Sequence, residues 1–228
     1  MNAPQVHRTG VWDLPLRLFH WALVLCVLAA VVSTKLSGDG ALRIHFLVGY
    51  CTLALMLFRV LWGFCGTHHA LFSSFVHRPG IVLAYLRGDR PERTPGHSPL
   101  GALAVLALLA ITGTMALSGL FTNDEIASEG PMAQFVTELA VRRWSQVHAW
   151  CEIALYALVA IHLLAIAFYR VVKKQDLVMP MITGYANDPS TSVDAELLDP
   201  NARAVNLRAA IVFAMCSALV AFIATLIH

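Results

Sequence analysis

The sequence predicts an all-α integral membrane protein with five membrane-spanning helices. Hydrophobic residues make up 58% of the 228 residues and charged residues only 13%, whereas soluble domains contain about 45–50% apolar and about 25% charged residues. The apolar residues also gather into long runs, and a helix needs about 20 such residues to cross a bilayer. Five runs meet this requirement: 14–33, 42–64, 99–121, 144–172 and 206–227.

The segments around these runs predict how the spans are arranged. The connection 34–41 is short, which makes the first two spans antiparallel neighbours. The run 144–172 exceeds the length that a crossing requires, so we expect it to protrude or tilt. Residues 79–88 have the pattern of a brief helix lying on the membrane surface.

The segment 173–205 is rich in Asp, Pro, Asn and Ser, a composition typical of a loop. It separates the last apolar run from the others. We therefore divide the chain into a transmembrane core domain at 1–187, a cytoplasmic linker at 188–205 and an additional transmembrane helix at 206–228.

An alternative for the first run is a secretory signal, because the small residues Ala29, Ala30 and Ser33 lie near its end. Its apolar stretch, however, is longer than the about 7–15 residues of a signal's hydrophobic region. Cleavage would also remove His20. We interpret the run as a membrane span.

The distribution of Lys and Arg predicts the orientation. One side of the membrane carries the connection between spans one and two and the connection between spans three and four. Of the 16 Lys and Arg residues, only four lie on that side: Lys35, Arg43, Arg142 and Arg143. The positive-inside rule places the other side, with the amino terminus, in the cytoplasm. Five spans then place the carboxyl terminus outside.

Cysteine usage limits the kind of cofactor that the chain can hold. Cys26, Cys51, Cys65, Cys151 and Cys216 all lie within or at the ends of apolar runs, where a free Cys behaves as a small hydrophobe. We predict no disulfide framework. The sequence also lacks C-x-x-C-H, the signature of covalent haem attachment, so any haem would be of b type.

Four histidines lie within or at the edge of the spans, where an ionisable side chain usually marks function. Because successive helices alternate in direction, depth in the membrane can be assigned from the sequence. His45 and His148 share the outer level, and His20 and His162 share the inner level. His148 and His162 are 14 residues apart in one helix. Their side chains therefore point within about 40° of the same direction around the helix axis and lie about 21 Å apart along it.

Two such histidine pairs predict two haem b groups, one held by His20 and His162 and the other by His45 and His148. Two imidazoles fill both axial positions of a haem iron, which favours electron transfer over activation chemistry. The alternative is that these histidines only bridge helices through hydrogen bonds. The other histidines, His7, His68, His69, His77 and His228, are predicted to be solvated or interfacial, and His97 to belong to a helix start with Ser98 and Pro99.

An ordered series of short motifs from about Trp12 to Tyr185 resembles the bacterial cytochrome b561 and nickel-iron hydrogenase b-type cytochrome family. The motifs are Trp12-Asp-Leu-Pro-Leu-Arg-Leu-Phe-His20-Trp21, Arg43-Ile-His45, Gly49-Tyr50, Arg59-Val-Leu-Trp62-Gly63, Gly96-His97-Ser-Pro-Leu-Gly101, Val147-His148-Ala-Trp150, Ile161-His162 and Met181-Ile-Thr-Gly184-Tyr185.

The resemblance implies a four-helix transmembrane bundle that holds two haems, in the bacterial inner membrane. It also implies electron transfer between a periplasmic redox partner, either a hydrogenase or a c-type cytochrome, and the quinone pool. Two features depart from the family's pattern. The fifth span lies outside the usual core, and Cys151 and Glu152 follow His148 where hydrogenase cytochromes often carry another histidine.

Three arginines near the predicted haems are candidates to bind the anionic propionates. Arg17 lies one turn before His20, Arg43 at the outer end of the second span and Arg59 at its inner end. Each could equally be an arginine whose head group extends to the membrane surface. The connection between spans three and four carries Asp124, Glu125, Glu129 and Glu138, which could face a basic partner or simply be solvated.

We therefore expect an electron-transfer subunit of a membrane oxidoreductase, with lipid, quinone and a periplasmic redox protein as partners and with no nucleic-acid partner. Two alternatives remain open. One is a self-contained quinol-dependent oxidoreductase, although the sequence shows no flavin or nucleotide fingerprint. The other is a metal or proton transporter that uses the histidines as a relay, although we find no internal repeat of the kind that many transporters contain.

Overall fold

The computed structural model describes residues 8–76, 78–87, 96–123, 129–187 and 202–225. Its main elements are five long helices, each long and apolar enough to cross a membrane. The chain is an all-α, multi-pass membrane bundle, as the sequence predicts. The long helices are α1 (Leu14–Ser33), α2 (Asp39–Cys65), α5 (Pro99–Gly119), α6 (Glu138–Val171) and α8 (Ala202–Thr225).

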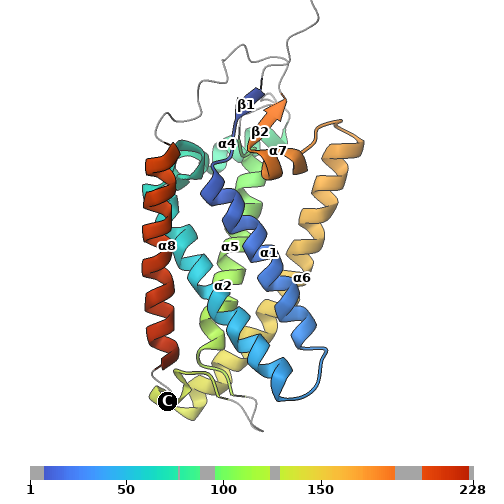
Figure 1. Cartoon of the computed structure of the whole chain (residues 1–228). Helices are drawn as coiled ribbons and strands as arrows, with labels where there is room; N and C mark the ends of the chain where they lie inside the picture. Colours follow the sequence, from blue (N-terminus) through green and yellow to red (C-terminus); the bar gives the residue numbers. More distant parts are fainter. Residues whose placement is uncertain (1–7, 77, 88–95, 124–128, 188–201, 226–228) are drawn as a thin grey trace, which may run out of the picture.

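The five long helices alternate in direction along the bundle (Figure 1). We call the end where α1 begins the proximal end, and the opposite end, where α1 finishes at Ser33, the distal end. The proximal end also carries most of the short elements of the fold. These are η1 (His68–Ala70), α3 (Phe72–Phe75), α4 (Pro79–Leu86) and α7 (Val178–Thr183), with the strands β1 (Arg8–Gly10) and β2 (Tyr185–Asn187). The short helix η2 (Ala133–Phe135) lies at the distal end, between α5 and α6.

Local sequence signals explain where three of the long helices begin. Asp13 caps α1 by accepting a hydrogen bond from Leu16 N at 2.6 Å. Ser98 caps α5 in the same way, and Thr137 caps α6. Side-chain oxygens at this position satisfy backbone N–H groups that the first turn of a helix leaves without a partner. Pro follows in the first turn of α1 and of α5, where its missing N–H costs nothing.

Helix α2 is the centre of the packing. It lies against α1, α5 and α8, while α6 packs on α5. Leu55, Met56, Phe58 and Trp62 of α2 are buried in the main core, together with Leu16 and Phe19 of α1 and Val205, Ala209 and Cys216 of α8. The additional helix therefore packs directly on the central helix. Most of the linker predicted before it, residues 188–201, lies outside the described residues, and the division into domains stays a prediction.

Helix α6 begins six residues earlier than the apolar run predicts, at Glu138 rather than 144. The polar residues of this first stretch interrupt the hydrophobic pattern, but the Thr137 cap extends the helix through them. At about 1.5 Å per residue, its 34 residues span about 51 Å, well beyond the about 30 Å of a bilayer core. The prediction that this helix protrudes agrees with its length.

The long helices expose most of their apolar residues. Between 11% and 39% of the most hydrophobic window of each helix is buried inside the bundle. In water such a surface would be unfavourable, at about 25 cal/mol for each Å² of apolar area. In a bilayer the same surface faces lipid. The exterior of the bundle thus provides its lipid contact.

A small two-stranded sheet ties the end of α7 to the start of α1. Strands β1 and β2 pair antiparallel, with Gly10 opposite Tyr185. Val11 N donates to Gly184 O at 2.8 Å, and Trp21 Nε1 donates to Met181 O at 3.1 Å. This segment packs against the α1 turn that precedes His20.

Candidate functional site

His45 and His148 face one another at the distal end of the bundle. His45 lies in the second turn of α2, and His148 lies in α6, past its polar first turns. Their ring centroids are 6.4 Å apart, with an angle of 75° between the ring planes. The pairing by depth predicted from the sequence places these two residues together, and the described structure brings their rings into contact range.

The same arrangement of serine and backbone carbonyl holds both rings. His45 Nδ1 lies 3.1 Å from Ser33 Oγ and 3.4 Å from Ala30 O, and Ser33 Oγ donates to that same Ala30 carbonyl at 2.7 Å. A hydroxyl that donates to the carbonyl can accept from the imidazole. His45 Nδ1 therefore carries its proton, which leaves Nε2 as the nitrogen with a lone pair.

His148 repeats this pattern on the other side. Its Nδ1 lies 3.1 Å from Ser118 Oγ and 3.0 Å from Met115 O, and Ser118 Oγ donates to Met115 O at 2.9 Å. Hydrogen bonds of this kind fix the tautomer and orientation of metal-binding histidines. Ser33 and Ser118 are both buried. Sequence reasoning missed them, because a serine bonded to the carbonyl three residues before it is common in helices.

The spacing of this pair brings both rings close enough to serve one bound group. The ring centroids of His45 and His148 are 6.4 Å apart. For comparison, a zinc–imidazole bond is about 2.0–2.1 Å long. The two imidazoles would be the protein's ligands to a metal centre held between them.

Two histidines alone do not complete the coordination of a metal ion. Within the described residues, no group of three or more His, Cys, Asp or Glu side chains gathers around a possible metal position. A haem brings four nitrogen donors of its own and needs only the two axial ligands. The residues present at the distal pair therefore fit haem b.

His20 and His162 form the proximal pair. His20 comes from α1 and His162 from α6, two turns before that helix ends, and their pairing stays a prediction. The Nδ1 atom of His20 is buried without a hydrogen-bond partner among the described residues. His20 also packs edge-on against Trp21, with centroids 5.1 Å apart. Among the described residues, His20 therefore lacks the Nδ1 hydrogen bonds that hold the two distal rings.

The three candidate arginines occupy different surroundings. Arg17 donates from Nη1 to Ile182 O, while its Nε is buried without a partner among the described residues. Arg43 is exposed, two residues before His45. Arg59 is only 2% exposed. A role in binding propionates stays a prediction for all three, and Arg17 has the unused donor that such a role requires.

Comparison with known proteins identifies the family. Residues 11–184 match the family model described as prokaryotic cytochrome b561. The chain belongs to the prokaryotic cytochrome b561 family. It is therefore a membrane cytochrome b, and haem b is the cofactor of its family.

Several relatives of this cytochrome are named probable Ni/Fe-hydrogenase B-type cytochrome subunits. The relative from Azotobacter chroococcum is 29% identical over 208 residues, covering 77% of this chain and 87% of the relative. The relative from Cupriavidus necator is 28% identical, covering 81% and 89%. The Escherichia coli K12 relative, a hydrogenase 1 subunit by name, is 23% identical, covering 77% and 89%. No solved structure matches the chain significantly.

Arg59 lies in a polar network at the proximal end of the cytochrome. Its Nη1 donates to Ala70 O at 3.2 Å, and its guanidinium lies 4.9 Å from the centre of the Phe72 ring. Asp13 accepts from Trp62 Nε1 at 3.1 Å and from Thr67 Oγ1 at 2.5 Å. This network joins the start of α1 to the end of α2, and sequence reasoning did not predict the role of Asp13 in it.

Three further histidines gather beside this network. His97 packs between Trp12, at 4.6 Å, and Phe75, at 4.5 Å between ring centroids. Burial, together with the positive charge of Arg59, lowers the pKa of His97 to about 4. His69 is half-buried and His68 is exposed, so the prediction of a solvated or interfacial residue fits His68 best. His7, His77 and His228 lie outside the described residues.

Gly119 lets α5 approach the distal histidine. A Cβ at this position would lie 3.4 Å from His148 Cε1, so the ring packs directly against the backbone of α5. At Gly113, earlier in the same helix, a Cβ would meet Met56 Cε at 3.6 Å.

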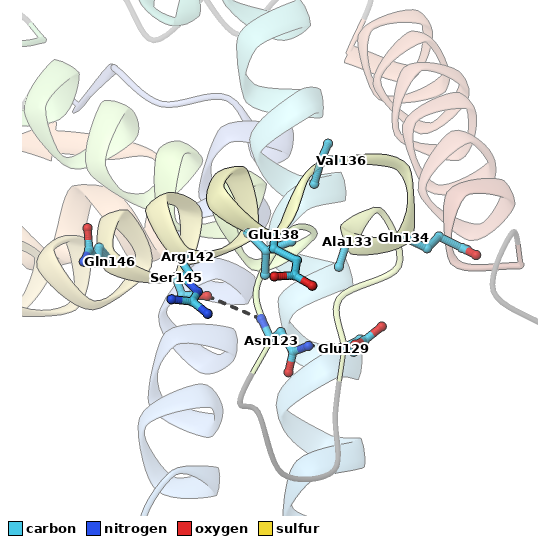
Figure 2. Close-up of a pocket in the computed structure, with 10 residues that line it drawn as sticks. Asn123, Glu129, Ala133, Gln134, Val136, Glu138, Arg142, Ser145 and Gln146 are labelled. Atoms are coloured by element: carbon cyan, nitrogen blue, oxygen red, sulfur yellow. Dashed lines mark hydrogen bonds between the residues drawn. The ribbon is translucent and has the colours of Figure 1, made fainter.

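A polar pocket opens at the distal end, between the first turns of α6 and the segment that precedes them. Figure 2 shows Glu138 and Arg142 of α6 with Asn123 and Glu129 of that segment around it. The acidic connection predicted from the sequence includes Asp124 and Glu125, which lie outside the described residues. Glu129 and Glu138 both line the pocket.

Proposed function

We propose that this cytochrome carries electrons between a periplasmic redox protein and the quinone pool, using two haem b groups in one chain. A b-type haem with two imidazole ligands supplies a reversible one-electron centre with no open coordination position. The observation that carries the proposal is the pair His45 and His148, with a ring spacing of 6.4 Å and both Nδ1 atoms held by a serine and a carbonyl.

The chain's own residues would hold the two haems at different levels. His45 and His148 serve the distal haem, and His20 and His162 serve the proximal one. Helix α6 contributes one ligand to each, about 21 Å apart along its axis. Arg17, whose buried Nε has no hydrogen-bond partner among the described residues, is the strongest candidate for the propionates of the proximal haem, while Arg43 and Arg59 are further candidates.

The orientation follows from the distribution of charge. Twelve of the 16 Lys and Arg residues belong to the proximal side, which the positive-inside rule assigns to the cytoplasm. The distal pair then lies near the periplasmic surface of the bacterial inner membrane. A periplasmic protein that releases two electrons would be oxidised there, and one quinone would take up two electrons and two protons to become quinol.

A hydrogenase is the partner that the relatives support, because several of them are named Ni/Fe-hydrogenase B-type cytochrome subunits. With such a partner the electrons come from hydrogen, which releases two electrons and two protons. A c-type cytochrome is the other partner class that the sequence suggests. In either case the chain acts as the membrane subunit of an oxidoreductase.

The test is the amount of haem in the purified chain and what reduces it. Pyridine haemochrome analysis should give two b haems for each chain. Hydrogen should reduce both in native membranes, and oxidised quinone should reoxidise them. A fully loaded preparation with no haem or one haem would contradict the two-haem assignment. Reduction by quinol with reoxidation by a small acceptor alone would favour a self-contained oxidoreductase instead.

A further inference from the structure

The pocket at the distal end is a defined part of the fold, and none of the four candidate histidines is among its described lining residues. Its volume is about 810 Å³, and its lining is largely polar. Small-molecule sites of similar size are mostly apolar, with a few placed polar groups. An open, polar pocket is instead the kind of surface that receives hydrophilic side chains of another protein.

Backbone hydrogen bonds fix one wall of this pocket. The segment after α5 folds back on the end of that helix through Gly130 N to Thr122 O, at 2.7 Å, and Met132 N to Leu120 O, at 2.8 Å. Asn123 Nδ2 donates to Glu129 Oε1 at 2.7 Å. A Cβ at Gly130 would lie 2.5 Å from Leu120 O, so no larger residue fits. Glu129 is thus held beside the pocket.

The protruding start of α6 forms the opposite wall. Glu138, Arg142 and Ser145 are spaced by four and three residues, which places them on one face of the helix. All three line the pocket. In Figure 2 the Glu138 carboxylate lies toward the middle of the pocket, and Arg142 lies beside Ser145. The extra length of α6 therefore gives the pocket a polar wall outside the bilayer core.

The pocket stands close to the distal histidine pair. Ser145, in its wall, is three residues from His148, about 4.5 Å along the helix axis. The neighbouring Trp144 stacks on Phe121 at the end of α5, with centroids 5.4 Å apart and planes 24° apart. A protein seated in the pocket would be about one helical turn from the residue that ligates the distal haem.

We propose that this pocket is where the periplasmic redox protein docks, and that it receives a Lys or Arg side chain of that protein beside Glu138 and Glu129. The inference rests on the function proposed above. The described lining residues include two carboxylates, Glu129 and Glu138, and one guanidinium, Arg142. One negative charge is therefore left for a cationic side chain of the partner. Such complementarity sets partner choice and association rate.

Photo-crosslinking tests where the partner lies. The full chain, loaded with haem, would carry a photoreactive residue at Gln134, which lines the pocket, or at the exposed Leu36, in the distal connection outside it. In native membranes the Gln134 position should form an adduct with a metal- or haem-containing redox protein, at a peptide that contains Lys or Arg, and the Leu36 position should not. An adduct with a second copy of this chain, or none while the redox protein still copurifies, overturns the proposal.

Charge substitution tests the chemistry of docking. Glu138→Gln should raise the partner concentration for half-maximal haem reduction about three- to tenfold, weaken its dependence on salt and leave the limiting rate unchanged. The matched control is Asp39→Asn, an exposed acid in the first turn of α2 at the same end. Equal effects of the two substitutions overturn the proposal.

A quinol reduction assay separates this inference from the function on which it rests. Haem reduction by quinol should be the same in Glu138→Gln and in the unaltered chain, because quinol does not use the pocket. If quinol reduces the haems but no redox protein copurifies or donates electrons, the proposed function fails, and the docking proposal fails with it. If the redox protein donates normally to Glu138→Gln, only the docking proposal fails.

Discussion

The two histidine pairs differ in what surrounds them. At the distal pair, a serine and a carbonyl hold each Nδ1, from Ser33 and Ala30 on one side and Ser118 and Met115 on the other. At the proximal pair, His20 Nδ1 is buried with no hydrogen-bond partner among the described residues. The comparison indicates that hydrogen bonds within the fold orient the distal rings, whereas no such bond orients His20 among the described residues.

Removing one histidine from each pair gives the largest expected effect. His148→Ala should abolish the distal haem and leave most of the proximal one, and His162→Ala should do the reverse, because each α6 histidine serves a different level. Reduced-minus-oxidised spectra and redox titration would measure the loss. His68→Ala, at an exposed histidine outside both pairs, is the control and should keep both haems. Loss of the distal signal in His20→Ala would show that the pairing by depth is wrong.

Removing the serine hydroxyls should have a smaller effect, confined to the distal site. Ser118→Ala frees His148 Nδ1 from one of its two partners, and loss of such an orienting group typically costs about 10- to 100-fold in metal affinity. The expected loss is at the lower end, since Met115 O still accepts from the ring. Haem retention during dilution would measure it, with Ser74→Ala, at a hydroxyl bonded to Leu71 O near the proximal end, as the control. Equal retention in both variants would mean that the cofactor orients the distal rings.

The smallest expected effect concerns acid stability at the proximal end. His97 has an ordinary pKa of 6.5 that burial and Arg59 lower to about 4, so between these values the unfolded chain binds a proton that the folded chain does not. Stability from this group is complete above about pH 6.5 and is lost as the pH falls toward about 4. The Tm of the unaltered chain should fall over this range, and that of His97→Gln should fall less. An unchanged slope in the variant would assign the acid sensitivity to other groups.

The sequence alone predicted the five spans and the approach of His45 to His148, because both depend on properties that the one-dimensional pattern contains. Long apolar runs define spans, and counting residues from alternate membrane surfaces gives the depth of each histidine. The beginning of α6 at Glu138 was not predicted, since hydrophobicity detects only the part of a helix that lies in lipid, and Arg142 and Arg143 ended the apolar run.

Contacts between helices were harder to predict. Ser33 and Ser118 bind the histidines only because α1 meets α2, and α5 meets α6, with a particular rotation, which no local pattern encodes. The burial of Arg59 depends on η1 and α3 folding over it, with Ala70 O as its acceptor. A basic residue near a span end extends to the surface in many membrane proteins, whereas Arg59 is only 2% exposed.

The position of α8 has a consequence for the order in which the protein is assembled. All four histidines precede this helix in the sequence, and α8 packs on α2, with lighter contact to α1. During synthesis α1, α2, α5 and α6 therefore enter the membrane first and already contain every proposed haem ligand. The part of the chain that contains the proposed ligands can therefore assemble before α8 packs on α2.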